Sequence, residues 1–367
     1  MSDPRLRLWA RTLVAYSVDV QPGQRVAITG GVAAAPLLTA VQRAVLERGG
    51  HPVLVPSLPD IEANLIAHGD DAQLAYISPV DRFAREEADA LINVLAETNT
   101  RSLAGVDPER QRVRRTARSP LLEATMRRTA EGAYKWVLTL FPTDAYAQDA
   151  DMATPEYAEF VYAACKLDAP DPAEAWKAQA AEQQRLIDWL AGKSELHLRG
   201  EGTDLRLSVA GRTWINADGA RNFPDGELFT GPVEDSAEGR VRFSFPVVTQ
   251  GREIGDIRLK FERGQVVDAA AARNEEFLIQ TLDTDPGARR LGEFAFGTNF
   301  DIQRFTKNIL FDEKIGGTVH MAVGAGYPDT GSVNQSAVHW DMICDLRRGG
   351  EVDVDGQPFM RDGRFVV

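Results

Sequence analysis

The order of apolar and polar residues in the first half of the chain predicts alternating strands and helices. A short apolar run at residues 25–29 is followed by apolar side chains at helical spacing over residues 34–48, and a second apolar run lies at residues 52–55. A strand, a helix and a second strand in this order predict a parallel pair, because parallel strands need a crossover connection. Residues 88–95 and 135–140 are predicted to be further strands of the same sheet.

The pattern changes near residue 191, where a helix-rich connector ends. Beyond it, short strands separated by regular turns dominate, at residues 196–198, 205–209, 240–245 and 257–261. We therefore predict an α/β protein of two domains. Residues 1–190 are expected to form an N-terminal α/β domain with a parallel sheet and a helical connector. Residues 191–367 are expected to form a C-terminal α+β domain rich in antiparallel strands.

Charge and composition narrow the classes of function. The chain has 367 residues, and its 54 acidic and 41 basic side chains give a formal net charge of -13, which repels phosphate backbones and anionic membrane surfaces. No apolar run approaches the ~20 residues of a membrane span, and the first residues lead into a helical pattern instead of a signal segment. We therefore predict a cytoplasmic protein that binds neither nucleic acid nor membranes. The two cysteines, Cys165 and Cys344, are too few for a disulfide framework and are predicted to be buried thiols.

Two imidazoles and three carboxylates in the last third of the chain form a candidate metal site. They are Glu227, Glu293, His320, His339 and Asp341. If residues 336–344 form a strand, His339 and Asp341 share one face, because side chains two apart in a strand point the same way. Imidazole nitrogen and carboxylate oxygen both bind Zn, Mn or Co, at roughly 2.0 to 2.2 Å, and five ligands divided between two ions leave a position open for water.

Six ordered sequence blocks carry a resemblance to a known family. The blocks are residues 202–205, 225–232, 287–293, 308–313, 320–324 and 339–341. In this order they resemble the aminopeptidase T and aminopeptidase S family of two-metal exopeptidases. The resemblance implies that Glu227, Glu293, His320, His339 and Asp341 are metal ligands and that Tyr327 is the active-site tyrosine. It makes the C-terminal domain the catalytic, metal-binding one.

The same resemblance implies the reaction and its participants. It implies a metal-dependent aminopeptidase that uses two divalent ions, Zn, Co, Mn or Mg, to hydrolyse peptides with a free amino terminus, and it implies a homodimer. Glu293 or Asp341 is expected to bridge the ions, because a carboxylate can bridge two metals whereas an imidazole ordinarily cannot. We expect a carboxylate such as Glu227 or Glu293 to relay a proton, and Tyr327 to donate a hydrogen bond to the oxyanion.

Other interpretations of these residues stay open. A histidine in a strand is more often structural, Glu227 could be a turn carboxylate, and Glu293 could pair with a nearby arginine. A His-x-Asp pair with a distant histidine also occurs in mononuclear iron oxygenases, and a metal-binding protein that has lost turnover would keep the same ligands. The interval from His320 to His339 is 19 residues (339 - 320), shorter than in some members of the family, which predicts a trimmed loop. Gly30 and Gly31 lack the lysine and third glycine of a phosphate loop, so we interpret them as turn residues.

Overall fold

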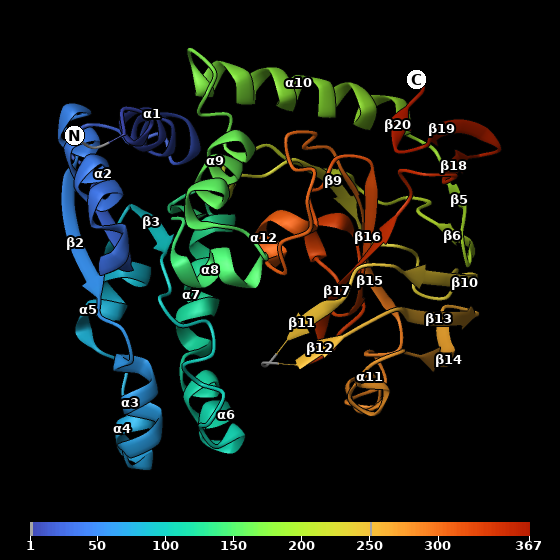
Figure 1. Cartoon of the computed structure of the whole chain (residues 1–367), viewed down its shortest axis with the longest axis horizontal. Helices are drawn as coiled ribbons and strands as arrows, with labels where there is room; N and C mark the ends of the chain where they lie inside the picture. The colour runs from blue at the N-terminus through green and yellow to red at the C-terminus, as the bar shows by residue number, and fades with distance from the viewer. Residues whose placement is uncertain (1–2, 250–251) are drawn as a thin grey trace. The chain divides into compact units, whose positions relative to one another are not determined.

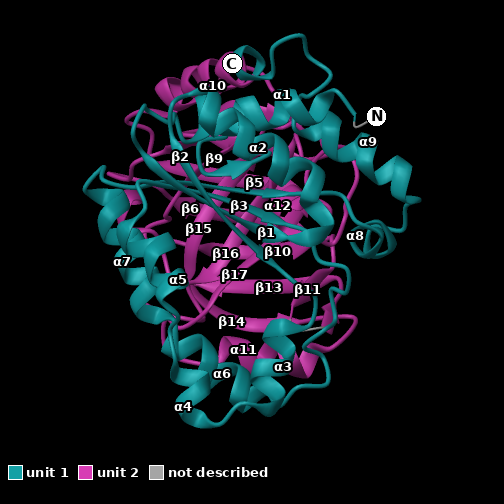
Figure 2. Ribbon diagram, turned by 90° about the vertical axis from the view of Figure 1, so that its left-hand side faces the viewer, with its two compact units in different colours: residues 1–175, 219–224 teal, residues 176–218, 225–367 magenta. Residues whose placement is uncertain are grey.

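The computed structural model describes residues 3–249 and 252–367, which form two compact units (Figures 1 and 2). Unit 1 contains residues 1–175 and 219–224, and unit 2 contains residues 176–218 and 225–367. The sequence predicts a domain boundary between residues 190 and 191, at the end of helix α10 (Pro172–Leu190), and this stays a prediction, because residues 176–190 of that helix belong to unit 2. Within the described ranges, no helix combines the length and the apolar character that crossing a membrane requires.

Unit 1 is built on a parallel sheet, as the sequence predicts. Its strands lie in the order β2 (His51–Ser57), β1 (Arg25–Gly31), β3 (Ala90–Leu95), β4 (Lys135–Leu140) and β8 (Asn222–Phe223), and every neighbouring pair is parallel. Three successive residues of β1, Val26 to Ile28, are completely buried, which shows that both faces of the strand are covered. The edge strand β2 instead leaves Val53 and Leu54 exposed.

Helices connect the strands of unit 1, and their ends follow local sequence signals. Pro36 stands in the first turn of α2, where the missing amide hydrogen costs nothing, and Thr143 caps α8 by accepting a hydrogen bond from the amide of Tyr146. The helices are α1 (Arg5–Thr12), α2 (Ala35–Glu47), α3 (Ile61–His68), α4 (Asp71–Ala75), α5 (Pro79–Arg82), α6 (Pro108–Ala117), α7 (Ser119–Ala130), α8 (Asp144–Asp149) and α9 (Thr154–Ala164).

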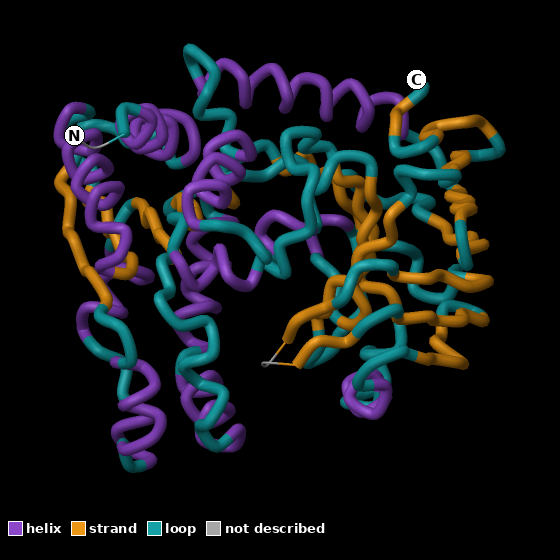
Figure 3. The backbone as a smooth tube through the Cα atoms, viewed as in Figure 1, coloured by secondary structure: helices purple, strands orange, loops and turns teal. Residues whose placement is uncertain are grey.

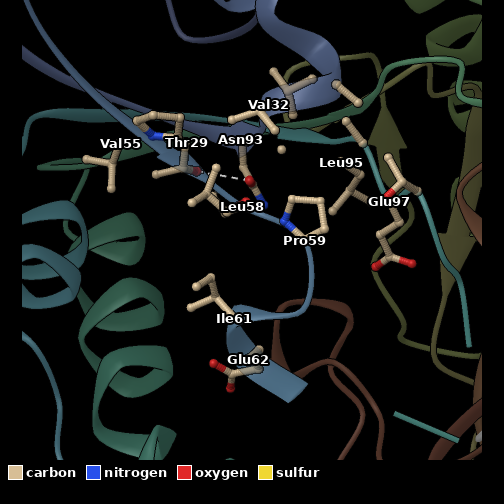
Figure 4. A pocket seen from close by; sticks show the side chains of 18 of the residues that line it. Thr29, Val32, Val55, Leu58, Pro59, Ile61, Glu62, Asn93, Leu95 and Glu97 are labelled. Carbon is tan, nitrogen blue, oxygen red and sulfur yellow. Dashed lines mark hydrogen bonds between the residues drawn. The ribbon is translucent and has the colours of Figure 1, made fainter. Parts of the chain in front are cut away.

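A crevice opens at the carboxyl ends of β1 and β3, where the order of strands reverses direction (Figure 4). Its volume is about 530 Å³, and a hydrogen bond from Thr29 Oγ1 to Asn93 Oδ1 (2.9 Å) lies within it. A Cβ at Gly30 would lie 2.6 Å from the carbonyl oxygen of Val94, and one at Gly31 would lie 2.7 Å from that of Ala96. Close packing of β1 against β3 therefore explains both glycines without a phosphate ligand.

Unit 2 is rich in antiparallel strands, in agreement with the prediction (Figure 3). An eight-stranded sheet has the order β14 (Gln265–Ala270), β13 (Ile257–Glu262), β10 (Glu238–Phe243), β6 (Thr203–Ser208), β5 (Glu195–Gly200), β18 (Glu351–Val354), β19 (Gln357–Arg361) and β20 (Arg364–Phe365). A five-stranded sheet has the order β17 (His339–Asp345), β16 (Thr318–Gly324), β15 (Leu291–Gly297), β9 (Glu227–Thr230) and β7 (Ile215–Ala217). Strands β11 (Val247–Thr249) and β12 (Arg252–Ile254) pair in antiparallel fashion, and unit 2 also contains most of α10 together with α11 (Glu275–Leu282) and α12 (Ile309–Asp312).

One face of the five-stranded sheet packs into the main hydrophobic core of unit 2. Phe294, Phe296, Met321, Trp340 and Met342 alternate with residues of the opposite face and are all buried there. Phe296 is fully buried, and its ring centroid lies 5.0 Å from those of Phe294 and Phe359. The core therefore fixes the strands whose other face carries the candidate site. Cys344 lies in this core, and both cysteines are buried as predicted.

Truncating Phe296 to alanine is expected to destabilise the protein by about 3 to 5 kcal/mol, because it removes a fully buried ring and leaves a cavity. Differential scanning calorimetry should show the loss as a lower melting temperature. Val333→Ala removes methyl groups from a side chain that is 75% exposed, so it should change stability by less than about 0.5 kcal/mol. Equal melting temperatures for the two variants would contradict this account of the core.

Candidate metal centre

Four neighbouring strands bring the five predicted ligands onto one face of a sheet. Glu227 opens β9, Glu293 lies on β15, His320 on β16, and His339 and Asp341 on β17 (Figure 1). The pairing of Glu293 with Ala322, and of Ala322 with Asp341, places these side chains in one row across three strands. Residues up to 114 positions apart in the chain, from Glu227 to Asp341 (341 - 227), thus lie on the same sheet, with β15 and β16 between their strands.

Small residues separate the charged ones on this face. Ala295 and Gly297 follow Glu293 at two-residue intervals, and Ala322 and Gly324 follow His320 in the same way. Side chains at two-residue intervals point to the same face. The alternation of acid or imidazole with alanine or glycine therefore leaves room above the sheet between the ligating groups.

Glu293 lies between the two imidazoles. Its Oε1 is 3.4 Å from His320 Nε2, and its Oε2 is 3.2 Å from His339 Nε2. Glu227 Oε2 is 3.6 Å from His320 Nε2, and Asp341 Oδ1 is 3.5 Å from His339 Nε2. Each imidazole therefore faces two carboxylates, and one of these carboxylates is common to both.

Backbone carbonyls fix the orientation of both imidazoles. Nδ1 of His320 lies 3.0 Å from the carbonyl oxygen of Glu313, and Nδ1 of His339 lies 2.8 Å from that of Ala325. A carbonyl can only accept, so each Nδ1 donates its hydrogen. In the neutral imidazole this leaves the Nε2 lone pair directed at the carboxylates, the arrangement that protein zinc and manganese sites use to orient histidine ligands.

The structure adds Glu313, which our sequence prediction did not name as a ligand. Glu313 directly follows α12, and its side chain can converge with those of His320 and Asp341 so that one ligand atom from each lies within 4.8 Å of the others. Glu293, His339 and Asp341 form a second such group. Asp341 belongs to both groups. The only signal in the sequence was the family block at residues 308–313, which ends at Glu313.

Buried charges surround these groups. Lys314 is completely buried, and its ammonium contacts Glu313 and lies 3.8 Å from Glu227 Oε1 and 4.0 Å from Asp225 Oδ1. Burial raises the pKa of Glu227 well above its usual range and raises that of Asp225 to about 7. Oε2 of Glu227 is a buried oxygen without a hydrogen-bond partner in the described structure, as expected of an atom that binds a cation.

Tyr327 lies beside the second group of ligands. Its hydroxyl is 3.5 Å from His339 Nε2, and its ring makes an edge contact with that imidazole at a centroid distance of 5.1 Å. The residue as a whole is 43% exposed, but desolvation at the hydroxyl end and the nearby carboxylates raise its pKa. Tyr327 therefore remains a protonated hydrogen-bond donor at neutral pH.

At the two histidines, the nearby carboxylates raise the pKa of the imidazole by more than burial lowers it. Burial alone would lower the pKa of each imidazole, but hydrogen bonding to Glu293 raises that of His320 to about 10, and hydrogen bonding to Asp341 and Glu293 raises that of His339 to about 11. The reciprocal effect on Glu293 overcomes its burial and lowers its pKa to about 2. In the metal-free protein the centre therefore holds protonated imidazoles against ionised Glu293.

We expect both imidazoles of the metal-free protein to stay protonated at pH 8, with NMR titration midpoints far above the ordinary value of about 6.5. Because the folded-state pKa is raised, these contacts stabilise the fold fully below pH 6.5 and lose that effect as the pH rises toward 10 to 11. Nitrogen chemical shifts of the imidazoles measure this directly.

A matched variant controls that measurement. Glu293→Gln removes the carboxylate that both imidazoles share and should lower both midpoints, whereas Glu351→Gln alters a carboxylate that pairs with Arg199 and should lower neither. Ordinary midpoints in the unsubstituted metal-free protein would contradict the geometry of this centre.

Comparison with known proteins places this geometry in a family. Residues 2–365 match the thermophilic metalloprotease (M29) family. Aminopeptidase T of Thermus thermophilus is 31% identical over 74% of this chain and 75% of its own length, and aminopeptidase 2 of Geobacillus stearothermophilus is 28% identical over 99% of this chain and 98% of its own.

Two solved structures are similar over nearly the whole chain. Wild-type AmpT from Thermus thermophilus superposes with a TM-score of 0.86 at 25% identity, covering 99% of both chains. The 2,5-dihydroxypyridine dioxygenase of Pseudomonas putida KT2440 has a TM-score of 0.62 at 16% identity, covering 100% of this chain and 98% of its own, a likeness of fold alone. The family match spans the strands that carry the imidazoles and carboxylates, so the chain belongs to the thermophilic metalloprotease (M29) family and is a metalloaminopeptidase that uses divalent metal.

Proposed function

We propose that this metalloaminopeptidase holds two divalent ions and uses them to remove the amino-terminal residue of peptides. Glu293, His339 and Asp341 would bind one ion, and His320, Glu313 and Glu227 would bind the other. The observation that carries the proposal is the position of Glu293, whose two oxygens lie 3.4 and 3.2 Å from the two imidazoles. Glu293 and Asp341, which belongs to both ligand groups, would bridge the ions.

The residues fit divalent ions. The partnerless Oε2 of Glu227 and the two Nδ1 hydrogen bonds to carbonyls are what a centre of mixed nitrogen and oxygen ligands requires. Such ligands accept Zn, Co or Mn, and also Mg, so the native metal depends on availability. When bound, the ions would polarise the scissile carbonyl and lower the pKa of a water from ~15.7 to about 7.

The surrounding side chains would transfer the proton and stabilise the oxyanion. We propose that Glu227 also relays the proton of the attacking water to the leaving amine, through the carboxylate oxygen that does not bind the ion, because the side chain is buried and burial raises its pKa. Glu293, with its lowered pKa, would stay ionised throughout. Tyr327 would donate its hydroxyl hydrogen to the oxyanion that develops on the carbonyl.

The excess of carboxylates supports an exopeptidase. A substrate with a free amino terminus carries an ammonium group, which a carboxylate of the centre can accept, whereas an internal peptide bond offers no such charge. Peptides are therefore the proposed partners. The homodimer, the cytoplasmic location and the absence of nucleic-acid binding stay predictions from the sequence.

The ligand geometry also favours the peptidase over the mononuclear iron oxygenase. Non-haem iron oxygenases use two imidazoles and one carboxylate. Each group of ligands that converges among the described residues here contains one imidazole and two carboxylates instead. These two groups support the peptidase over an iron oxygenase, and the metal content of the purified protein tests the choice.

Activity and metal content measured on one purified sample test the proposal. We expect two divalent ions per chain and release of the first residue from a peptide with a free amino terminus, with at least about tenfold slower cleavage of the acetylated peptide, which lacks the ammonium group. His339→Ala should lose metal and activity while circular dichroism stays unchanged, because catalytic ligands usually sit on a scaffold that folds without the ion. One iron with oxygen consumption, or two ions without cleavage, would refute the peptidase.

Tyr327→Phe removes only the hydroxyl and keeps the ring contact with His339. We expect kcat and kcat/KM to fall together by about 10- to 1000-fold, the range for losing one transition-state hydrogen bond, while metal content holds. Tyr76→Phe serves as a control for the loss of a hydroxyl, because Tyr76 belongs to unit 1 and is 61% exposed. A rise in KM alone would assign Tyr327 to substrate binding instead.

A further inference from the structure

Lys314 is a buried cation among the carboxylates of the metal centre. It follows Glu313 at the end of α12, and its side chain has no exposed surface. Three carboxylates converge on its ammonium: that of Glu313 is in contact, and those of Glu227 and Asp225 lie 3.8 and 4.0 Å away. Burying an ammonium group is costly unless charges of opposite sign surround it, so this environment accounts for the presence of the lysine.

The carboxylates surround the ammonium of Lys314 as they would surround a bound metal ion. Glu227 and Glu313 face the candidate metal ligands and Lys314 at once, because Glu227 also lies 3.6 Å from His320 Nε2 and Glu313 also groups with His320 and Asp341. The ammonium and a divalent ion therefore share the same carboxylates. Asp225 is the exception, because among the described residues it approaches the lysine but lies within 4.0 Å of neither imidazole, unlike Glu227, and joins neither group of converging ligands, unlike Glu313.

The number of charges in the centre also indicates that the ammonium of Lys314 acts as one of its cations. Five buried or partly buried carboxylates gather around it, those of Asp225, Glu227, Glu293, Glu313 and Asp341. Asp312 is not counted, because among the described residues its carboxylate forms no ion pair with Lys314 or with either imidazole and instead accepts hydrogen bonds from the amide and hydroxyl of Thr306 at 2.7 and 2.9 Å. When all five carboxylates are ionised, one ammonium leaves four negative charges, which two divalent ions would balance.

We propose that Lys314 is a tethered third cation of this centre, which balances the carboxylates that two divalent ions leave uncompensated. The inference rests on the proposed two-metal function. Because the ammonium shares Glu227 and Glu313 with the ions, it repels them. Lys314 therefore stabilises the metal-free protein and weakens the binding of divalent ions. The ammonium of Lys314 would also occupy the position beside Asp225. A third divalent ion could then not bind there, and the centre would hold two ions.

Lys314→Met tests this, because methionine is similar in length and carries no charge. The metal-free variant should melt at a lower temperature than the unsubstituted protein. The increase in melting temperature on adding Mn²⁺ should be larger in the variant, and calorimetric titration should show Mn²⁺ binding at least about tenfold tighter, as expected on removing a charge of like sign a few ångströms away.

Two further variants separate charge from packing. Leu310→Ala removes buried apolar volume from α12 without changing charge, and it should lower the melting temperature equally with and without Mn²⁺. Combining Lys314→Met with Asp225→Asn removes one charge of each sign, and it should return Mn²⁺ affinity to within about threefold of the unsubstituted value. This double variant also keeps the test usable if Lys314→Met alone does not fold without metal.

These measurements distinguish a failure of the tethered-cation proposal from a failure of the two-metal proposal. If the unsubstituted protein binds no Mn²⁺, the two-metal proposal fails. If it binds two ions and Lys314→Met shows an unchanged or smaller stabilisation by Mn²⁺, or the double variant fails to restore the affinity, the tethered cation is refuted and the two-metal proposal stands.

Discussion

The mutual repulsion of carboxylates gathered on one face of a sheet is the constraint on which the rest of unit 2 depends. Glu227, Glu293 and Asp341 lie on neighbouring strands, and Asp225 and Glu313 approach from adjoining turns. Such a cluster persists where cations compensate it or where burial raises the pKa of its members and favours their neutral forms, as at Glu227 and Asp225. Protonated His320 and His339, together with Lys314, supply that compensation in the metal-free protein, and divalent ions would replace the two imidazole protons.

The opposite face of the same strands supplies the rigidity that this cluster requires. Phe294, Phe296 and Trp340 alternate with the site residues and are locked in the core, so a ligand cannot move away from its neighbours without disturbing that packing. Alternate residues along each strand thus have different roles: those on one face pack in the core and stabilise the fold, and those on the other face form the candidate site. Glycine and alanine on the site face keep the space between ligands open.

The sequence predicts much of this because the signals are local. Parallel strands β1 to β4 follow from apolar runs with helices between them, and His339 and Asp341 share a face because they are two residues apart in a strand. The registers that bring Glu227 and Glu293 to the histidines depend on pairing between distant segments, and only the family resemblance pointed to them. Glu313 and Lys314 were missed because adjacent acid and base in a turn are typical of an exposed surface pair.

Fold and ligand set carry different information about chemistry. The chain has the fold of an aminopeptidase and shares its outline with a dioxygenase, so the architecture alone does not choose between hydrolysis and oxidation. The choice depends on the balance of groups at the strands. One imidazole with two carboxylates in each converging group suits hard or borderline ions that polarise carbonyls. A carboxylate shared between two imidazoles suits a pair of ions more than a single one, because its two oxygens already point in the two directions that a bridge needs.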